Sequence, residues 1–334
     1  MRSFWDPRQL AHAPSIEMHN GRIEACAETP ARARAILDAV GPTEVPRDQG
    51  EGPLLRVHPQ AYLDFVKSAH TDWLAAGREG DALPYTFPVA RRRQISLDRI
   101  DARLGRYSYD TCTPITEGTW TSAYWNVQTA LSGLDALLGG ERAAFALCRP
   151  PGHHCGADYM GGYCYLNTAA VAAEAAIAAG KDRIAILDID YHHGNGTQDV
   201  FYARGDVLFV SIHADPATDY PFYWGHADET GEGEGEGATL NLPLPRGTGI
   251  GNYRAALDKA LERIMAFAPD LLVCSFGADT YVKDPISYFA VETEDYPAIA
   301  RSIAALGRPT LIVMEGGYAV DALGQNVAAF LSGF

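Results

Sequence analysis

The stretch IAILDIDYHHGNGT, residues 184–197, decides the architecture of this chain. It begins as an apolar run typical of a buried strand and continues directly into Asp188, Asp190, His192 and His193. Burying ionisable side chains costs free energy unless they are paired or bind a metal. We therefore expect a core strand whose carboxyl end opens onto a polar site.

Apolar runs of this kind alternate with helical patterns along the chain. The runs that predict strands are residues 143–148, 183–189, 207–212, 271–276 and 310–314. The patterns that predict helices are residues 30–40, 59–76, 120–138, 168–180 and 253–268, and a segment after Thr293. Asn167 or Thr168 is expected to cap the helix at 168–180. Strands that alternate with helices indicate an α/β fold, with a mostly parallel sheet and helices on both faces.

One segment departs from this regular pattern. Residues 77–118 are rich in Gly, Pro, Arg and Tyr and carry Tyr85, Tyr109 and the run Arg91-Arg92-Arg93. Irregular segments of this length are usually functional or disordered. No polar linker divides the chain, so we expect a single domain over residues 1–334 with an insert loop at about 77–118.

Composition restricts the class of protein. The net charge of −15 argues against a nucleic-acid binder and is compatible with a small cationic ligand. No apolar run reaches membrane-spanning length, and residues 1–16 lack a signal-peptide core. The six cysteines are scattered without CxxC spacing. We therefore expect a cytoplasmic protein with reduced thiols that binds neither membranes nor nucleic acid.

Polar groups follow four of the expected strands at the point where each strand ends. They are RPPGHH at 149–154, Asp190 with His192, Asp279, and EGGY at 315–318. In open parallel sheets, ligands bind outside the carboxyl ends of the strands. We therefore expect these four groups to meet in one site.

Within that site, Asp190, His192 and Asp279 are the candidate metal ligands. Three protein ligands leave a coordination position for water, which marks a catalytic metal rather than a structural one. Oxygen and nitrogen donors suit Zn²⁺, Fe²⁺ or Co²⁺, and the residues alone do not choose between these metals.

His153 and His154 are the candidate proton-handling pair. Each imidazole needs a neighbour that sets its tautomer, and Asp188 and Asn195 can serve. Tyr318, on a flexible stem after two glycines, can donate a hydrogen bond to a developing oxyanion.

The motifs RPPGHH, GGYCYLN, DIDYHHGNGTQDVFY, GADT and EGGY, in this order, resemble the histone deacetylase superfamily. The resemblance extends from the E-x-P-x-R pattern at Glu28–Arg32 to the C-terminus. Within the superfamily, YDTCTPITEGTW and DPISYF are most similar to the bacterial acetylpolyamine amidohydrolases. The resemblance implies an arginase-deacetylase fold with one Zn²⁺.

The resemblance also implies roles for individual residues. The zinc ligands would be Asp190, His192 and Asp279. The catalytic group would comprise His153, His154, Tyr318, Asp188 and Asn195. The substrate would contact the aromatic walls Tyr163 and Tyr220, together with Gly162 and Gly316.

Members of the superfamily also bind K⁺, mainly through backbone carbonyls. The inner potassium site would use Asp188, Asp190, His192, Ser211 and Ile212. The outer site would use Phe201, Arg204 and Val207. In acetylpolyamine amidohydrolases the loop that corresponds to residues 77–118 packs against a second subunit and narrows the tunnel mouth. The resemblance therefore implies a homodimer, with Asp110 or Glu117 as carboxylates near the rim.

The chemistry implied is metal-dependent hydrolysis of a linear amide. We expect removal of acetyl groups from acetylated polyamines or other small acetylated amines, which releases acetate and the free amine. A protein lysine deacetylase with the same chemistry is the alternative. A binuclear ureohydrolase would need a second bridging carboxylate, which GADT lacks. An inactive binding module is disfavoured by the intact set of metal and catalytic residues.

Overall fold

A parallel sheet forms the centre of the molecule. In the computed structural model, which describes residues 1–89, 95 and 97–334, seven strands form this sheet in the order β1-β4-β9-β8-β5-β6-β7, and every neighbouring pair is parallel. The strands are β1 (Arg2–Phe4), β4 (Ala143–Ala146), β5 (Ile184–Asp188), β6 (Val207–Ala214), β7 (Thr239–Leu244), β8 (Leu271–Phe276) and β9 (Thr310–Met314). The predicted α/β class with a parallel sheet is confirmed.

All five predicted strands are present, with ends that differ from the prediction by at most two residues. They were recognisable because β4, β5, β6, β8 and β9 are buried at every position, so each reads as a continuous apolar run. The two edge strands, β1 and β7, were not predicted. β1 has three residues, and β7 is only partly buried and contains Pro243, as edge strands often do.

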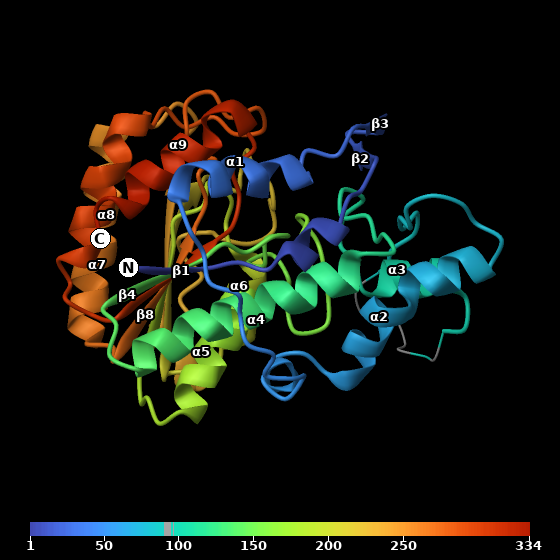
Figure 1. The fold of residues 1–334 in the computed structure, drawn as a ribbon, viewed down its shortest axis with the longest axis horizontal. Coiled ribbons are helices and arrows are strands. Elements are labelled where there is room, and N and C mark those ends of the chain that lie inside the picture. The colour runs from blue at the N-terminus through green and yellow to red at the C-terminus, as the bar shows by residue number, and fades with distance from the viewer. Residues whose placement is uncertain (90–94, 96) are drawn as a thin grey trace.

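Helices cover both faces of the sheet (Figure 1). They are α1 (Pro30–Val40), α2 (Gln60–Ala75), α3 (Ile100–Arg106), α4 (Thr119–Leu138), α5 (Thr168–Ala178), α6 (Asn195–Phe201), α7 (Ile250–Phe267), α8 (Tyr296–Ala304) and α9 (Val320–Leu331). Figure 1 shows α4 and α5 on one face, and α7, α8 and α9, with α1 beside α9, on the other. The predicted helices are confirmed, and Asn167 caps α5 by accepting from the amide of Ala170 at 2.9 Å. The short helices α3 and α6 and the C-terminal α9 were not predicted.

The strand order explains why the four polar groups meet. β4, β9, β8 and β5 are consecutive neighbours in the sheet. Their carboxyl ends lead into the segments that begin at Leu147, Glu315, Gly277 and Ile189. Because the strands are parallel, these four ends lie along one edge of the sheet.

The insert at 77–118 is more ordered than its composition suggested. Ala82 and Ile115 exchange two backbone hydrogen bonds, at 2.9 and 3.0 Å, which close the base of the excursion. Within it lies α3, whose Ile100 and Leu104 are buried. The prediction of an irregular loop is therefore wrong for α3. Seven residues are too few for a clear helical pattern, and packing on α2 stabilises the helix. The run Arg91-Arg92-Arg93 lies outside the described residues.

Two compositional expectations can be compared with the described residues. All six cysteines are free thiols, and five of them are buried. The described part of the chain contains no helix that is both long and apolar enough to cross a membrane.

A short hairpin and a buried histidine lie outside the central sheet. β2 (Glu17–His19) and β3 (Arg22–Glu24) pair antiparallel. His58, just before α2, is fully buried; its Nδ1 lies 2.9 Å from the carbonyl of Ala157, and its Nε2 lies 3.0 Å from the amide nitrogen of Asn167. A neutral imidazole with hydrogen on Nδ1 satisfies both neighbours, and burial lowers the pKa of His58 to about 4.

We predict that His58 makes the protein acid-sensitive. The unfolded chain takes up this proton near pH 6.5, whereas the folded chain resists it down to about pH 4. The free energy of unfolding should therefore fall as the pH drops from about 6.5 to about 4, by roughly 2–3 kcal/mol from this residue. Denaturant titrations at pH 7 and 4.5 measure this difference. His58→Gln, which keeps donor and acceptor groups but does not titrate, should show a smaller difference; an equal one contradicts the assignment.

Candidate metal centre and active site

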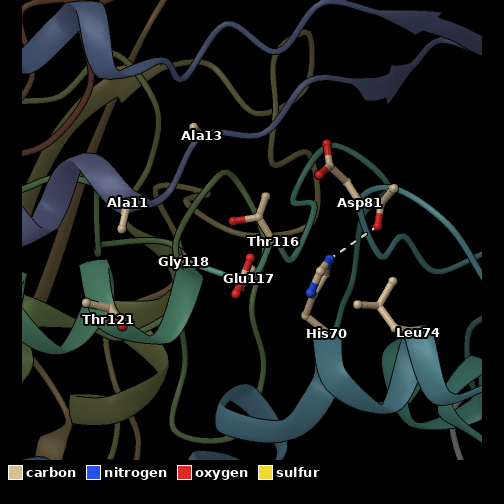
Figure 2. Close-up of a pocket in the computed structure, with 10 residues that line it drawn as sticks. Ala11, Ala13, His70, Leu74, Asp81, Thr116, Glu117, Gly118 and Thr121 are labelled. Carbon is tan, nitrogen blue, oxygen red and sulfur yellow. Dashed lines mark hydrogen bonds between the residues drawn. The ribbon is translucent and has the colours of Figure 1, made fainter.

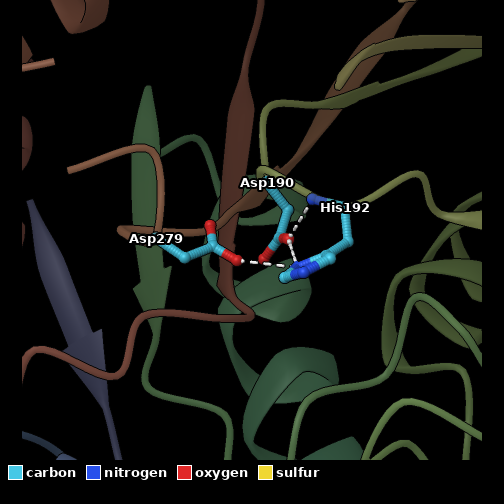
Figure 3. A group of neighbouring side chains, drawn as sticks. All are labelled: Asp190, His192 and Asp279. Atoms are coloured by element: carbon cyan, nitrogen blue, oxygen red, sulfur yellow. Dashed lines mark hydrogen bonds and ion pairs between the residues drawn. The ribbon is translucent and has the colours of Figure 1, made fainter. Parts of the chain in front are cut away.

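Three predicted ligands converge beyond the ends of β5 and β8 (Figure 3). Nδ1 of His192 lies 3.0 Å from Oδ2 of Asp279 and 3.4 Å from Oδ1 of Asp190. One ligand atom from each residue lies within 4.8 Å of the others. The two aspartates are buried, and His192 is 12% exposed, so the imidazole lies at the solvent-facing side of the triad.

The backbone fixes these carboxylates in place. Asp190 Oδ2 accepts from the amide of Gly316 at 2.8 Å, and Asp279 Oδ1 accepts from the amide of Tyr191 at 2.9 Å. A Cβ on Gly316 would lie 2.5 Å from Asp190 Oδ2, so only glycine allows this approach.

The residues fit a divalent cation. Burial, together with the charge of Asp190, raises the pKa of Asp279 to about 7. Two adjacent buried carboxylates repel each other and are stabilised when a cation lies between them. Two carboxylates and one imidazole leave a position for water, as a catalytic Zn²⁺, Fe²⁺ or Co²⁺ site requires.

The tandem histidines have the two predicted partners. His153 Nδ1 lies 2.9 Å from Oδ2 of Asp188, and His154 Nδ1 lies 2.7 Å from Oδ1 of Asn195. Both imidazoles are buried, and their ring centroids are 4.1 Å apart. Asp188 is the last residue of β5, and Asn195 is the first of α6, so one strand and the next helix orient the pair.

These partners give the two imidazoles opposite protonation. Burial by itself lowers the pKa of His153, but the carboxylates of Asp188 and Asp190 outweigh it and raise that pKa to about 10. Burial, with the charges of His153 and His192, lowers the pKa of His154 well below its ordinary value. His153 is therefore a cation at neutral pH, and His154 is neutral.

Tyr318 lies on a rigid stem, so the expectation of a flexible one is wrong. Arg32 donates from Nε to the carbonyl of Gly317 at 2.6 Å and from Nη2 to that of Glu315 at 2.5 Å. From the other side, Asp284 Oδ2 accepts from the amides of Tyr318 and Ala319 at 2.7 and 3.1 Å. Glycine next to Tyr318 suggested freedom that these tertiary hydrogen bonds remove.

The phenol of Tyr318 is suited to donate a hydrogen bond. Burial raises the pKa of Tyr318 well above its ordinary value, and the Arg32 guanidinium, 4.8 Å from the ring centroid, offsets only part of the effect. The hydroxyl therefore keeps its proton at neutral pH.

The sequence analysis placed EGGY at the site but assigned no role to its first residue, Glu315, a buried carboxylate next to the histidines. Glu315 Oε2 accepts from the amides of Gly152 and His153 at 2.6 and 3.2 Å, and Oε1 accepts from Ser275 at 3.1 Å. Burial raises the pKa of Glu315 to about 7. The available signal was an acid directly after an apolar strand, since β9 ends at Met314.

A second missed group is the ion cluster behind Tyr318. Glu28 accepts from Arg32 at 2.9 Å and from Arg149 at 2.8 Å, and all three side chains are buried. The E-x-P-x-R pattern was the only signal: Glu28 lies just before α1 and Arg32 lies in its first turn, four residues later.

Two aromatic rings lie on different sides of the centre. The Tyr220 ring lies 5.1 Å from His154 and 6.1 Å from His192, and the Tyr163 ring lies 5.6 Å from Tyr318. The Tyr163 hydroxyl donates to Glu17 Oε1 at 3.1 Å. A Cβ on Gly162 would lie 2.1 Å from the His154 ring, so glycine lets the chain pass directly over the imidazole.

Of the two rim carboxylates considered, the structure places only Asp110 beside Tyr220, at 2.8 Å from its hydroxyl. Glu117 instead lines a cavity of about 600 Å³, drawn in Figure 2 with His70 and Asp81. This cavity shares no residue with the metal triad. The centre is therefore identified by its chemistry rather than by cavity size.

The residues expected to bind potassium lie on β5 and β6, in the segment just after β5, and in the connection from α6 to β6. Ser211 pairs with Asp188 across β5 and β6, and its hydroxyl lies 2.8 Å from Nδ1 of His213. Ile212 follows in β6. Phe201, Arg204 and Val207 line the connection from α6 to β6, where the Arg204 amide donates to the Phe201 carbonyl at 2.9 Å.

Comparison with known proteins agrees with this geometry. The histone deacetylase domain matches residues 17–334. The chain therefore belongs to the histone deacetylase family, and it is a hydrolase of that family with a candidate metal site at Asp190, His192 and Asp279.

Particular relatives are similar over the whole chain. Acetylpolyamine amidohydrolase 1 of Pseudomonas aeruginosa is 49% identical, with 100% of this chain and 99% of the relative covered. Acetylpolyamine amidohydrolase of Mycoplana ramosa is 45% identical over 99% and 98% of the two chains. The crystal structure of acetylpolyamine aminohydrolase from Burkholderia pseudomallei superposes with a TM-score of 0.96 at 41% identity, over 100% and 98% of the chains. The arginase-deacetylase fold is thereby confirmed.

We predict that Asp279→Ala loses the bound metal together with all measurable activity. Two remaining ligands are too few for a tight open site, and the unshielded charge of Asp190 would also lower stability. Metal analysis of the purified variant measures the first effect. Glu117→Ala, which removes a carboxylate from the cavity of Figure 2, should keep its metal. Full metal occupancy in Asp279→Ala excludes that residue from the ligand set.

Proposed function

We propose that this chain removes acetyl groups from acetylated polyamines or similar small acetylated amines. The observation that carries the proposal is the pairing of His154 with neutral Asn195 and of His153 with Asp188, beside a buried metal triad. The full-length similarity to acetylpolyamine amidohydrolases supports the substrate class. The net charge of −15 favours a cationic substrate.

We propose Zn²⁺ as the metal, held by Asp190, His192 and Asp279; Fe²⁺ and Co²⁺ suit the same donors. When bound, the ion supplies an acidified water molecule and a Lewis acid for the acetyl carbonyl. The protein groups perform the proton transfers and stabilise the developing charge.

In the proposed mechanism, His154 accepts a proton through Nε2 from the water that attacks the acetyl carbon. The cationic His153 stabilises the negative charge that develops, and the Tyr318 hydroxyl donates to the oxyanion. His154 then gives its proton to the leaving nitrogen as the C–N bond breaks. The products are acetate and the free amine.

The shape of the site supports slender substrates. Tyr163 and Tyr220 present flat rings on two sides of the centre, which suit an unbranched alkyl chain. Acetate release from acetylputrescine, compared with release from an acetyl-lysine peptide, tests the assignment. Faster turnover of the peptide would favour the alternative of protein lysine deacetylation.

We further propose a structural K⁺ ion beside the centre. Ser211, with carbonyls of Asp188, Asp190, His192 and Ile212, would hold it, and a second ion would use carbonyls at Phe201, Arg204 and Val207. The pairing of Ser211 with Asp188 across two strands supports the inner site. Activity that depends on K⁺ concentration would test both ions.

The insert supports a proposal about assembly. Tyr85, Val89 and Ile95 are exposed apolar side chains close together in sequence on this segment, and exposed apolar groups of this kind often mark an interface. We propose a cytoplasmic homodimer in which residues 1–334 form one catalytic domain and the insert narrows the tunnel mouth.

Tyr318→Phe should separate metal binding from catalysis. The variant keeps the ring and its packing but loses the donor, so we predict full metal content and a loss of roughly 10²- to 10³-fold in turnover. Steady-state assays with acetylputrescine measure it, and the exposed Tyr223→Phe is the matched control. Turnover near that of the control contradicts the proposed role.

The triple variant Tyr85→Ser/Val89→Ser/Ile95→Ser tests the insert without disturbing buried residues. We predict a monomer by light scattering, intact metal content, and weaker preference for acetylputrescine over an acetyl-lysine peptide. Met265→Ser removes an exposed apolar side chain from α7 and should change neither property. If the triple variant stays dimeric and keeps its preference, these three side chains serve neither purpose.

A further inference from the structure

A buried phenol links the segment between two candidate metal ligands to a wall of the site. Tyr191 lies between Asp190 and His192, and its ring meets the His192 ring edge-on, with 4.9 Å between centroids. Its amide donates to Oδ1 of Asp279 at 2.9 Å. Its hydroxyl donates to Oδ1 of Asp219 at 2.8 Å, and both side chains are buried. The position of Asp219 is therefore linked to all three residues of the triad.

Asp219 begins the turn that carries Tyr220. The amide of Asp219 donates to the carbonyl of Asp215 at 3.0 Å, and its carbonyl accepts from the amide of Phe222 at 3.1 Å. Tyr220 lies inside this turn, and its ring centroid is 5.1 Å from that of His154. A shift of Asp219 would therefore move the backbone from which this aromatic wall projects.

The carboxylate of Asp219 is also held from the solvent side. Arg246 donates from Nε to Oδ2 of Asp219 at 2.8 Å, and its guanidinium lies 4.0 Å from the Tyr288 ring centroid. Burial by itself raises the pKa of Asp219, but the donated hydrogen bonds, first among them that from Arg246, outweigh it and lower this pKa. Asp219 is therefore an anion at neutral pH, and hydrogen bonds to an anion are stronger than those between neutral groups.

The turn needs such an anchor because its outer part is exposed and strained. Phe222 and Tyr223 are 50% and 82% exposed. Phe222 has a φ of 61°, which a bulky residue adopts only where surrounding contacts impose it. Exposed rings supply few such contacts, so buried groups must hold the turn. Asp110 accepts from the Tyr220 hydroxyl at 2.8 Å and fixes the far end of the ring, whereas Asp219 fixes its backbone end.

The position of the Tyr220 ring decides which amines fit beside it. One additional methyl group in a close-fitting pocket lowers kcat/KM by roughly 10- to 200-fold, provided that the walls do not move. A ring whose backbone is linked to the triad through Tyr191 keeps a constant distance from the reacting carbonyl. This constancy is what discrimination against branched substrates requires.

We propose that Asp219 is a positioning residue that sets the width of the substrate slot: through the Tyr191 hydroxyl it fixes the backbone of Tyr220 relative to the metal ligands, so that branched acetylated amines are excluded. This inference rests on the proposed function for the choice of substrates. The anchor itself rests on the hydrogen bonds of Tyr191, Asp219 and Arg246.

Tyr191→Phe tests the anchor because it keeps the buried ring and removes only the hydroxyl. The comparator is an acetylputrescine analogue with a methyl branch on the carbon next to the acetylated nitrogen. We predict unchanged metal content and a loss of roughly fivefold in the ratio of kcat/KM for acetylputrescine to kcat/KM for the branched analogue. Tyr62→Phe, which removes a buried hydroxyl that donates to the carbonyl of Tyr165 at 2.8 Å, should keep the wild-type ratio. A wild-type ratio in Tyr191→Phe overturns the inference.

Two further variants locate the anchor. In the Asp219→Ala background, Tyr191→Phe should change the ratio by less than about twofold, because the hydroxyl has no carboxylate left to bind. Arg246→Met removes the outer contact, and its effect should be smaller than that of Tyr191→Phe because the Arg246 side chain is half exposed. Independent effects of Tyr191→Phe and Asp219→Ala, or a larger effect from Arg246→Met, overturn the inference.

Hydrogen exchange tests the anchor without any substrate. Tyr191→Phe should speed exchange at the amides of Asp219 and Phe222 by roughly tenfold, whereas the amides of β5 and β8 keep their rates. Wild-type rates at both amides overturn the inference, whether or not Asp219→Ala folds. If the wild-type protein releases no acetate from acetylputrescine or from an acetyl-lysine peptide, the proposed function fails, and the exchange rates still decide whether Tyr191 and Asp219 hold the turn.

Discussion

Buried negative charge at one edge of the sheet is the constraint on which the rest of this structure depends. Asp188, Asp190, Asp279 and Glu315 are all fully buried and lie at or just beyond the carboxyl ends of three adjacent parallel strands. Carboxylates in such surroundings are tolerated only with compensating cations or donated hydrogen bonds. The protein supplies His153, six backbone amides and the Ser275 hydroxyl, and the remaining charge between Asp190 and Asp279 defines a candidate cation site.

Buried charge is also compensated next to the site, in the ion cluster beside Tyr318. Arg32 neutralises Glu28 and also donates to the carbonyls of Gly317 and Glu315, so one buried cation serves an ion pair and fixes the Tyr318 stem. Asp284 holds the other side through amides alone. The position of the Tyr318 phenol is therefore set by residues from α1 and from the loop after β8.

The site residues that follow a recognisable strand could be predicted from the sequence. The residues whose position depends on contacts between a loop and a distant part of the chain could not. Asp190, His192 and Asp279 follow buried strands whose apolar runs are unmistakable, and parallel topology brings such ends together. By contrast, Asp284 and Tyr109 lie in irregular segments, where nothing local shows which amide or side chain they will contact. The helix α3 was missed for a related reason: its burial against α2 outweighs a weak local pattern. The two glycines before Tyr318 suggested a flexible backbone, but hydrogen bonds from Arg32 and to Asp284 hold this segment in place.

The choice of Asn195 beside His154 explains why orientation matters in this site. A carboxylate there would attract a proton to the imidazole, as Asp188 does for His153. A neutral amide leaves His154 unprotonated, as the proposed base must be, but an amide lacks the two equivalent oxygens of a carboxylate. An amide can be reversed at little steric cost, so the surrounding protein must determine which end faces the imidazole. The Tyr109 hydroxyl of the insert lies 3.3 Å from Asn195 Oδ1, so a phenol from a segment distant in the sequence is one of the groups that surround this amide.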